Sequence, residues 1–136
     1  MQEASNMNIG LLLRAHARFR PDKIAVVFQE KRLSFLEFNK RVNRCANALQ
    51  GLGIEKGHKV ATILPNCLEL LEIYWAVAKI GAVVVPLSTL LLEKGIIALL
   101  RDSDAVMLIT NPVFAPLLEQ IKADLPGIPA ENYMLV

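Results

Sequence analysis

The chain has 136 residues with a formal net charge of +2, and 54% of them are hydrophobic, against about 45–50% in ordinary globular domains. Its longest charge-free runs, 80–92 and 105–118, contain prolines and are shorter than the roughly 18 apolar residues of a spanning helix. The segment 1–7 does not have a signal-peptide pattern, so we expect a cytoplasmic chain without a transmembrane segment.

The first predicted elements are a helix, a hairpin and a longer helix. Apolar periodicity predicts a helix over 9–19, and the alternation over 23–33 predicts a short hairpin. Ser34 and Glu37 match a capping box, in which each side chain accepts from a free backbone N–H. They open a predicted helix that ends at the glycines of 51–53.

Two apolar strands flank a helix in the middle of the chain. The runs 59–64 and 83–87 show no polar alternation, which is typical of strands covered on both faces in a parallel sheet. Gly81 is expected at the turn before the second strand, with positive φ. The segment 67–80 is apolar almost all round and predicts a central, largely buried helix, with Asn66 as its cap.

The remaining elements complete an alternating pattern. A helix over 92–101, a turn at 102–104, a strand over 105–109, a helix from 111 to about 125 and a strand from 133 are predicted. This order predicts an α/β fold: a parallel, doubly wound βαβ sheet with flanking helices and a short N-terminal hairpin. No linker or repeat divides residues 1–136, which we expect to be a single domain fragment of a longer protein, because the chain stops within an apolar strand.

Charged residues and cysteines give no sign of a catalytic or metal site. Residues 1–60 carry 11 Lys and Arg against 5 Asp and Glu, whereas 61–136 carry 4 against 8. The basic excess falls on the polar sides of two helical patterns without interleaved aromatics, so we expect solvated faces and no nucleic-acid partner. The residues concerned are Arg14, Arg18, Arg41 and Arg44.

Ionisable and nucleophilic residues are also isolated. Cys45 and Cys67 lack metal-ligand spacing, and the two histidines have no adjacent partner. A capping role and a solvent-facing position account for Glu69 and Glu72. Dinucleotide, phosphate-loop, nucleophile-elbow and zinc-protease motifs are all absent from the sequence. We therefore predict no catalytic and no metal-binding residue.

Three ordered segments resemble the start of the acyl-adenylate-forming synthetases, which include acyl-CoA synthetases, peptide-synthetase adenylation domains and luciferases. The segments are LSFLEFNKRVNRCANALQGLGIEKGHKVATILPNC (33–67), ELLEIYWAVAKIGAVVVPLS (69–88) and DSDAVMLIT (102–110). The resemblance spans about residues 8–125 and is most like a medium- or long-chain acyl-CoA synthetase. It departs from the family pattern at His58, Ile80 and Asp104; Asp is compatible with a left-handed turn.

This resemblance implies a reaction for a parent enzyme. A carboxylic acid, most like a fatty acid, would react with ATP and Mg to give an acyl-AMP, and CoA would then take the acyl group. The family's phosphate loop and catalytic Lys lie later in its chain than the part matched here. We therefore expect residues 1–136 to be inactive alone and to bind none of these cofactors tightly.

One short turn is a candidate cofactor contact. The resemblance places Ser88, Thr89 and Leu90 near the CoA nucleotide, but the glycines and arginines of relatives are missing here. The residues alone predict only a core strand and its exit turn.

Two other functions stay open: a stand-alone binding or assembly module derived from the family, and an unrelated flavodoxin-like binding domain. The apolar excess also predicts that the isolated chain self-associates.

Overall fold

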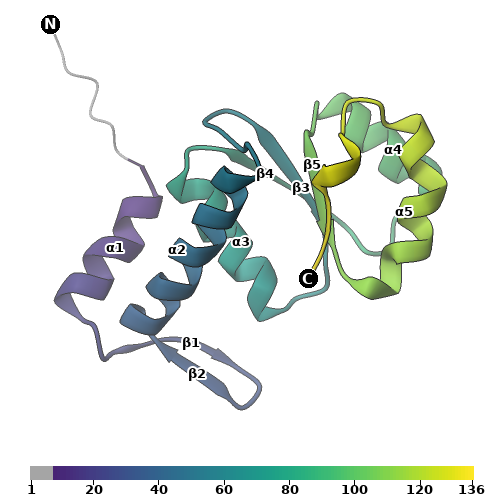
Figure 1. Cartoon of the computed structure of the whole chain (residues 1–136). Coiled ribbons are helices and arrows are strands. Elements are labelled where there is room, and N and C mark those ends of the chain that lie inside the picture. Colours follow the sequence, from purple (N-terminus) through teal and green to yellow (C-terminus); the bar gives the residue numbers. More distant parts are fainter. Residues whose placement is uncertain (1–7) are drawn as a thin grey trace, which may run out of the picture.

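A computed structural model describes residues 8–136, which form a parallel four-stranded sheet with helices on both faces and a two-stranded hairpin (Figure 1). The signal-peptide interpretation rests on residues 1–7, which lie outside the described part. The elements up to the first sheet strand are α1 (Gly10–Phe19), β1 (Ile24–Phe28), β2 (Lys31–Ser34), α2 (Phe35–Gly51) and β3 (Lys59–Ile63). The later ones are α3 (Leu68–Lys79), β4 (Val83–Leu87), α4 (Glu93–Asp102), β5 (Met107–Thr110), α5 (Ala115–Ile121) and β6 (Tyr133–Leu135), with 3₁₀ turns at Pro112–Phe114, Lys122–Asp124 and Ala130–Asn132.

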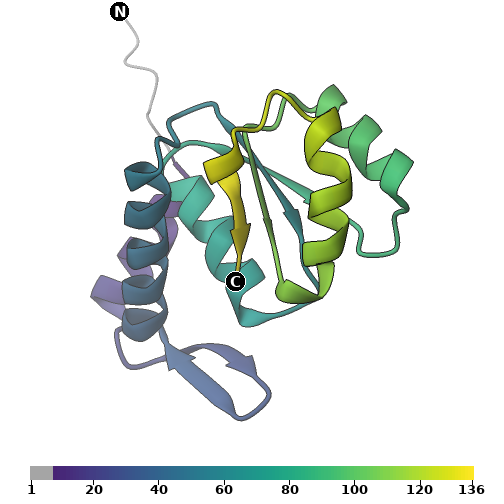
Figure 2. The same cartoon turned by 45° about the vertical axis from the view of Figure 1, so that its right-hand side comes forward.

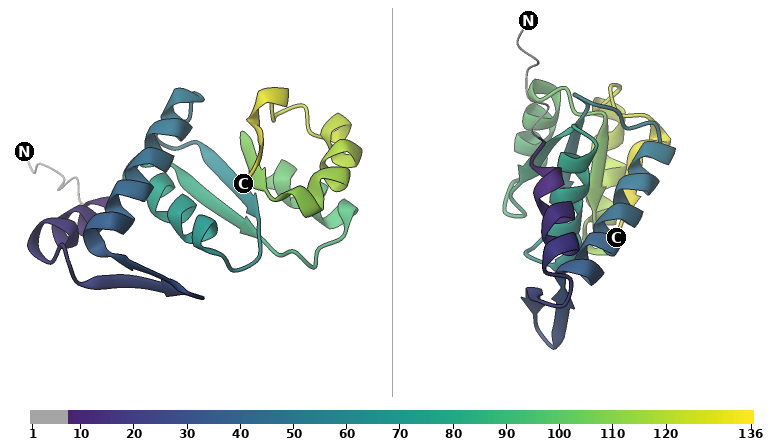
Figure 3. Two further views of the ribbon diagram at one scale, coloured as in Figure 1. Left: turned by 60° about the horizontal axis from the view of Figure 1, so that its bottom comes forward. Right: turned by 90° about the vertical axis from the view of Figure 1, so that its left-hand side faces the viewer.

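The sheet has the order β4-β3-β5-β6, and all its strands run parallel. Helices α1, α2 and α3 lie on one face, and α4 and α5 on the other (Figure 2). The hairpin of β1 and β2 is antiparallel, separate from the four-stranded sheet, and projects beside the start of α2 (Figure 3). The predicted doubly wound α/β fold is confirmed.

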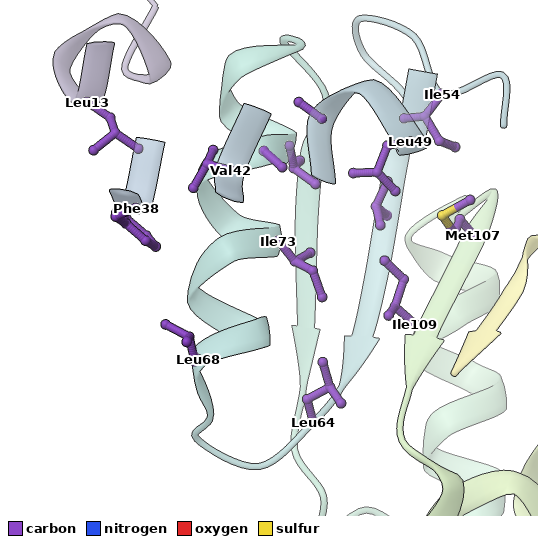
Figure 4. Close-up of a cluster of buried hydrophobic side chains, with 14 residues drawn as sticks. Leu13, Phe38, Val42, Leu49, Ile54, Leu64, Leu68, Ile73, Met107 and Ile109 are labelled. Carbon is purple, nitrogen blue, oxygen red and sulfur yellow. The ribbon is translucent and has the colours of Figure 1, made fainter. Parts of the chain in front are cut away.

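Two apolar clusters fill the space on either side of the sheet. On the α2–α3 face, the cluster extends from Leu13 on α1, beside Phe38, through Val42 and Ile73 to residues of β3 and β5 (Figure 4). On the other face, Leu100 and Ile121 pack against the same strands. Because each strand alternates its side chains between the two faces, β3 and β5 are buried on both.

Local turn and cap chemistry agrees with the sequence at most positions. The Glu37 N–H donates to Ser34 Oγ at 3.2 Å, and the Ser34 N–H donates to Glu37 Oε2 at 2.8 Å, so the capping box is confirmed. Gly81 and Asp104 have φ values of +74° and +54°. The expected cap by Asn66 is wrong, because α3 starts one residue later with Cys67 at the N-cap and without a side-chain bond.

The second apolar run is an edge strand. We expected 83–87 to be covered on both faces, but β4 has β3 as its only strand neighbour in the described part of the chain. Val83 is 47% exposed, and Pro86 is exposed too. Proline lacks the N–H that a central strand needs, so an edge position suits this sequence. The interpretation of this run as fully covered core is therefore wrong.

Helix α3 is the central helix of its layer, as predicted, but it is less buried than its composition suggested. It packs against α1 and α2 as well as the sheet. Trp75 is half-buried and packs against the apolar cluster, whereas Tyr74 is half-buried at the end of the sheet. Within residues 8–136, no helix has the length and apolar character needed to cross a membrane.

Candidate functional site

A groove of about 470 Å³ lies at the carboxyl ends of β3 and β4. The two strands are parallel neighbours in register, with Ile63 opposite Leu87, so the segments that follow them leave the sheet at the same end, the carboxyl end. Ligands of open parallel sheets bind at the carboxyl ends of the strands. The lining residues are Leu64, Pro65, Asn66, Leu70, Tyr74, Pro86, Leu87, Ser88 and Thr89.

The structure brings two of the three candidate residues to this groove. Ser88 and Thr89 line it, and Ser88 Oγ accepts a hydrogen bond from the Leu90 N–H at 3.2 Å. Leu90 is 88% exposed and is not among the lining residues. The bond between Ser88 and Leu90 is local to the turn after β4.

Asn66 and Tyr74 are lining residues that the sequence interpretation did not associate with this turn. The sequence pattern could have indicated Asn66. This residue follows β3, and the carboxyl ends of the consecutive parallel strands β3 and β4 lie side by side. Together with Ser88 and Thr89 they supply hydroxyl and amide groups. No Lys or Arg is among the lining residues. The groove therefore suits uncharged polar groups better than phosphate, which favours guanidinium or ammonium partners.

A second, smaller hollow of about 300 Å³ lies between α2 and α3, where Arg41, Arg44, Cys45 and Glu72 meet. The Nε of Arg41 donates to Oε1 of Glu72. We expected Glu72 on a solvent-facing line and Arg41 on a solvated face, but Glu72 is only 8% exposed. The expectation for Glu72 is wrong because α2 packs directly on this side of α3, and a buried carboxylate needs a partner. Arg41 remains partly exposed, with 35% of its side chain accessible, and supplies that partner.

Burial and the Arg41–Glu72 pair together shift the pKa values of two groups in this hollow. The hydrogen bond to Glu72 raises the pKa of Arg41, against the opposing effect of burial. Burial raises the pKa of the Cys45 thiol to about 11, and the charge of Glu72 adds to this. Because the thiolate is the nucleophilic form, Cys45 is a packed thiol rather than a reactive one at neutral pH. Among residues 8–136, no group of three or more His, Cys, Asp or Glu side chains is placed to hold a metal ion.

The chain matches the family model described as AMP-binding enzyme over residues 13–133. It is 37% identical over 124 residues to the long-chain-fatty-acid–CoA ligase FadD13 of Mycobacterium tuberculosis, covering 88% of this chain and 25% of that protein. It is 42% identical over 93 residues to a crotonobetaine/carnitine–CoA ligase of Shigella flexneri, covering 68% of this chain and 18% of the relative. The chain thus spans a quarter or less of the length of these relatives.

Solved structures show the same fold. The inhibitor-bound N-terminal domain of FACL13 from Mycobacterium tuberculosis matches with a TM-score of 0.85 and 32% identity, over 94% of this chain and 33% of that one. The anthranilate CoA ligase AuaEII, solved with anthranoyl-AMP, matches with a TM-score of 0.87 and 28% identity, over 96% of this chain and 25% of that one.

Proposed function

The chain belongs to the AMP-binding enzyme family, and on this premise we propose that it forms the N-terminal part of an ATP-dependent acyl-CoA synthetase. In the proposed reaction, a carboxylate oxygen attacks the α-phosphorus of ATP and pyrophosphate leaves. The sulfur of CoA then attacks the acyl carbon, and AMP leaves. We further propose a fatty acid as the carboxylic acid, since the similar FadD13 is a long-chain-fatty-acid–CoA ligase, and the cytoplasm as the compartment.

The observation that carries this proposal is the groove at the carboxyl ends of β3 and β4. It lies at the carboxyl ends of the strands, where such folds bind ligands. Ser88 and Thr89, which the resemblance to CoA-binding relatives places near CoA, line it. We propose that it forms one wall of the CoA side of the enzyme.

The residues of the groove fit only part of a CoA molecule. Asn66, Tyr74, Ser88 and Thr89 offer hydroxyl and amide groups that could bond the amide and hydroxyl groups of the CoA arm. They do not fit its phosphates, because no cationic side chain lines the groove. The groove residues would thus position a neutral portion of the cofactor.

We also propose that residues 1–136 alone do not catalyse adenylation. Adenylyl transfer needs hydrogen-bond donors and cations around the phosphates, and the sequence has neither a glycine-rich phosphate loop nor the later catalytic Lys. Purified chain is expected to show no carboxylate-dependent exchange of pyrophosphate into ATP above a blank without protein. Exchange above the blank contradicts this part of the proposal.

A chimera tests the assignment of the groove. Residues 8–136 replace the matching quarter of the similar Mycobacterium tuberculosis ligase, and pyrophosphate exchange and CoA-dependent AMP formation are measured separately. Thr89→Trp should raise the KM for CoA about tenfold or more and leave the exchange reaction unchanged. The larger side chain narrows only the groove that is proposed to bind CoA. The control Val113→Trp, at a residue 79% exposed and outside the groove, should change neither.

Two results would contradict the groove assignment: loss of both half-reactions together with Thr89→Trp, or loss of neither. A folded chimera without exchange activity would instead favour a non-catalytic module derived from the family.

A further inference from the structure

A third hollow, of about 490 Å³, lies at the opposite end of the sheet from the groove. It is bounded by the C-terminal end of α4, the turn before β5 and the loop over 125–128. We call it the α4 hollow. Because it lies at the amino end of β5, it is separate from the proposed CoA side, and nothing in the proposed reaction uses it.

The floor of the α4 hollow is apolar. It is formed by Leu100, Ala105, Leu125 and Ile128. Each of these side chains belongs to the core cluster beneath α4 and α5, and their exposed fractions lie between 2% and 6%. Water against such a floor finds few hydrogen-bond partners, so its displacement by an apolar group is favourable. The volume lies within the range of small-molecule sites, about 300–1,000 Å³.

The rim of the hollow carries opposite charges. Arg101, on the last turn of α4, donates from Nε and Nη2 to the Asp124 carbonyl oxygen at 3.0 and 2.8 Å. It also pairs with Asp124 Oδ1 at 3.6 Å. This contact ties α4 to the segment that leads into the loop over the hollow. Asp104 lines the hollow as well, whereas Asp124 lies outside its lining. Because the charge of Arg101 is already paired with Asp124, Asp104 is the unpaired charge at the rim and a ligand anion gains no net attraction.

We propose that the α4 hollow binds a small, uncharged aromatic alcohol. The ring would cover the floor formed by Leu100 and Ile128. A hydroxyl group both donates and accepts hydrogen bonds, so it matches a rim that offers the Asp104 carboxylate as acceptor and the remaining N–H groups of Arg101 as donors. A carboxylate in the same position would meet the like charge of Asp104.

Protein-detected NMR titration of the ¹⁵N-labelled chain tests this, with p-cresol as the probe and 4-methylbenzoate as the charged probe of similar shape. p-Cresol should shift the amide signals of 100–105 and 125–128 and saturate with a Kd on the order of a millimolar, as expected for a one-ring ligand. The Kd of 4-methylbenzoate should be at least about fivefold higher, since Arg101 is already paired with Asp124 and Asp104 repels a second carboxylate.

Two variants fill the hollow from different sides. Gly127 lines it, and a Cβ added there meets no atom within 4 Å, so Gly127→Phe should be accommodated and should occupy the mouth. Ala105→Val raises the floor. At least one of them should weaken p-cresol binding fivefold or more, whereas Val113→Phe, at an exposed residue outside the hollow, should leave it unchanged.

Several outcomes would overturn the proposal. These are shifts that do not saturate, shifts outside the two segments, equal binding of the two probes, or unchanged binding in both hollow-filling variants. A preserved amide spectrum of each variant, apart from the mutated neighbourhood, shows that a loss of binding is not a loss of fold.

Discussion

Arg41 on α2 donates a hydrogen bond to Glu72 on α3, and so links by opposite charges two helices that cover the same face of the sheet. Glu72 is nearly buried, and a carboxylate in such a place is costly without a partner. The ion pair therefore constrains how α2 sits on α3, in a layer that is otherwise held by apolar contacts.

Arg41→Ala should lower the free energy of unfolding by about 2–3 kcal/mol, because it leaves Glu72 without its cation. This is less than the loss of a fully buried pair, since the Arg41 side chain is 35% exposed and solvent screens part of the interaction. Urea denaturation measures the change. Arg44→Ala, at an exposed arginine of the same helix, is the control and should cost about 0.5 kcal/mol or less. Equal losses in the two variants would show that the pair adds nothing.

Cys45 should react slowly with thiol reagents. With a pKa of about 11, its thiolate fraction at pH 8 is about a hundredfold below that of a thiol with a pKa of 9. In the Cys67→Ser variant, iodoacetamide labelling of Cys45 followed by mass spectrometry should therefore accelerate as the pH rises toward 11. Glu72→Gln removes a charge that raises this pKa, so it should shift the profile to lower pH. A profile that levels off near pH 9 would contradict the assignment.

The sequence could predict what depends on neighbours along the chain. The Ser34–Glu37 capping box and the positive φ of Gly81 follow from local chemistry, and the structure has both. The exposure of β4 and the burial of Glu72 depend on which strand and which helix lie beside them, and a run of apolar residues does not carry that information. Pro86 was the one local sign that β4 is an edge strand.

Gly10 lies where α1 crosses α3, and its substitution should destabilise the chain. A Cβ added there would lie 2.5 Å from Lys79 Cα, a backbone atom that cannot yield without moving a helix. Gly10→Ala should therefore cost about 1–3 kcal/mol. Gly51→Ala is the matched control, since it is also helical, meets no atom within 4 Å, and should be neutral or stabilise by up to about 1 kcal/mol. Denaturant midpoints compare the two, and similar destabilisation by both would refute the close approach of α1 and α3.

Two buried hydroxyl groups should respond oppositely to removal. The Tyr133 hydroxyl is buried without a hydrogen-bond partner among the described residues, and burial raises its pKa. Thr110 Oγ1 donates to the Ile63 carbonyl oxygen at 2.6 Å. Tyr133→Phe should leave stability unchanged or raise it by about 1 kcal/mol, whereas Thr110→Val should lower it by about 1 kcal/mol. Thermal unfolding checks the order, and an equal loss in both would mean that the Tyr133 hydroxyl is bonded in solution.

The candidate site shows the same division between local and distant information. The sequence led to the turn after β4, where Ser88 and Thr89 line the groove. Asn66 lies 22 residues earlier and reaches the same groove only because β3 and β4 pair in parallel. The apolar floor of the α4 hollow is likewise assembled from separate segments, which meet only after the sheet has formed.

The open edge of β4 should make the isolated chain self-associate. One side of β4 pairs with β3, whereas its outer side has no strand neighbour among the described residues, and unpaired edges recruit further strands. Pro86 removes one N–H from this edge, so pairing is expected along Val83–Val85. Sedimentation at micromolar concentration should give a mass above the 15.1 kDa of one chain. Val83→Lys places a charge on the edge and should shift the mass toward that of one chain, whereas Val113→Lys, outside the sheet, should not. A single-chain mass for the unmodified protein would show that the edge is protected without a partner.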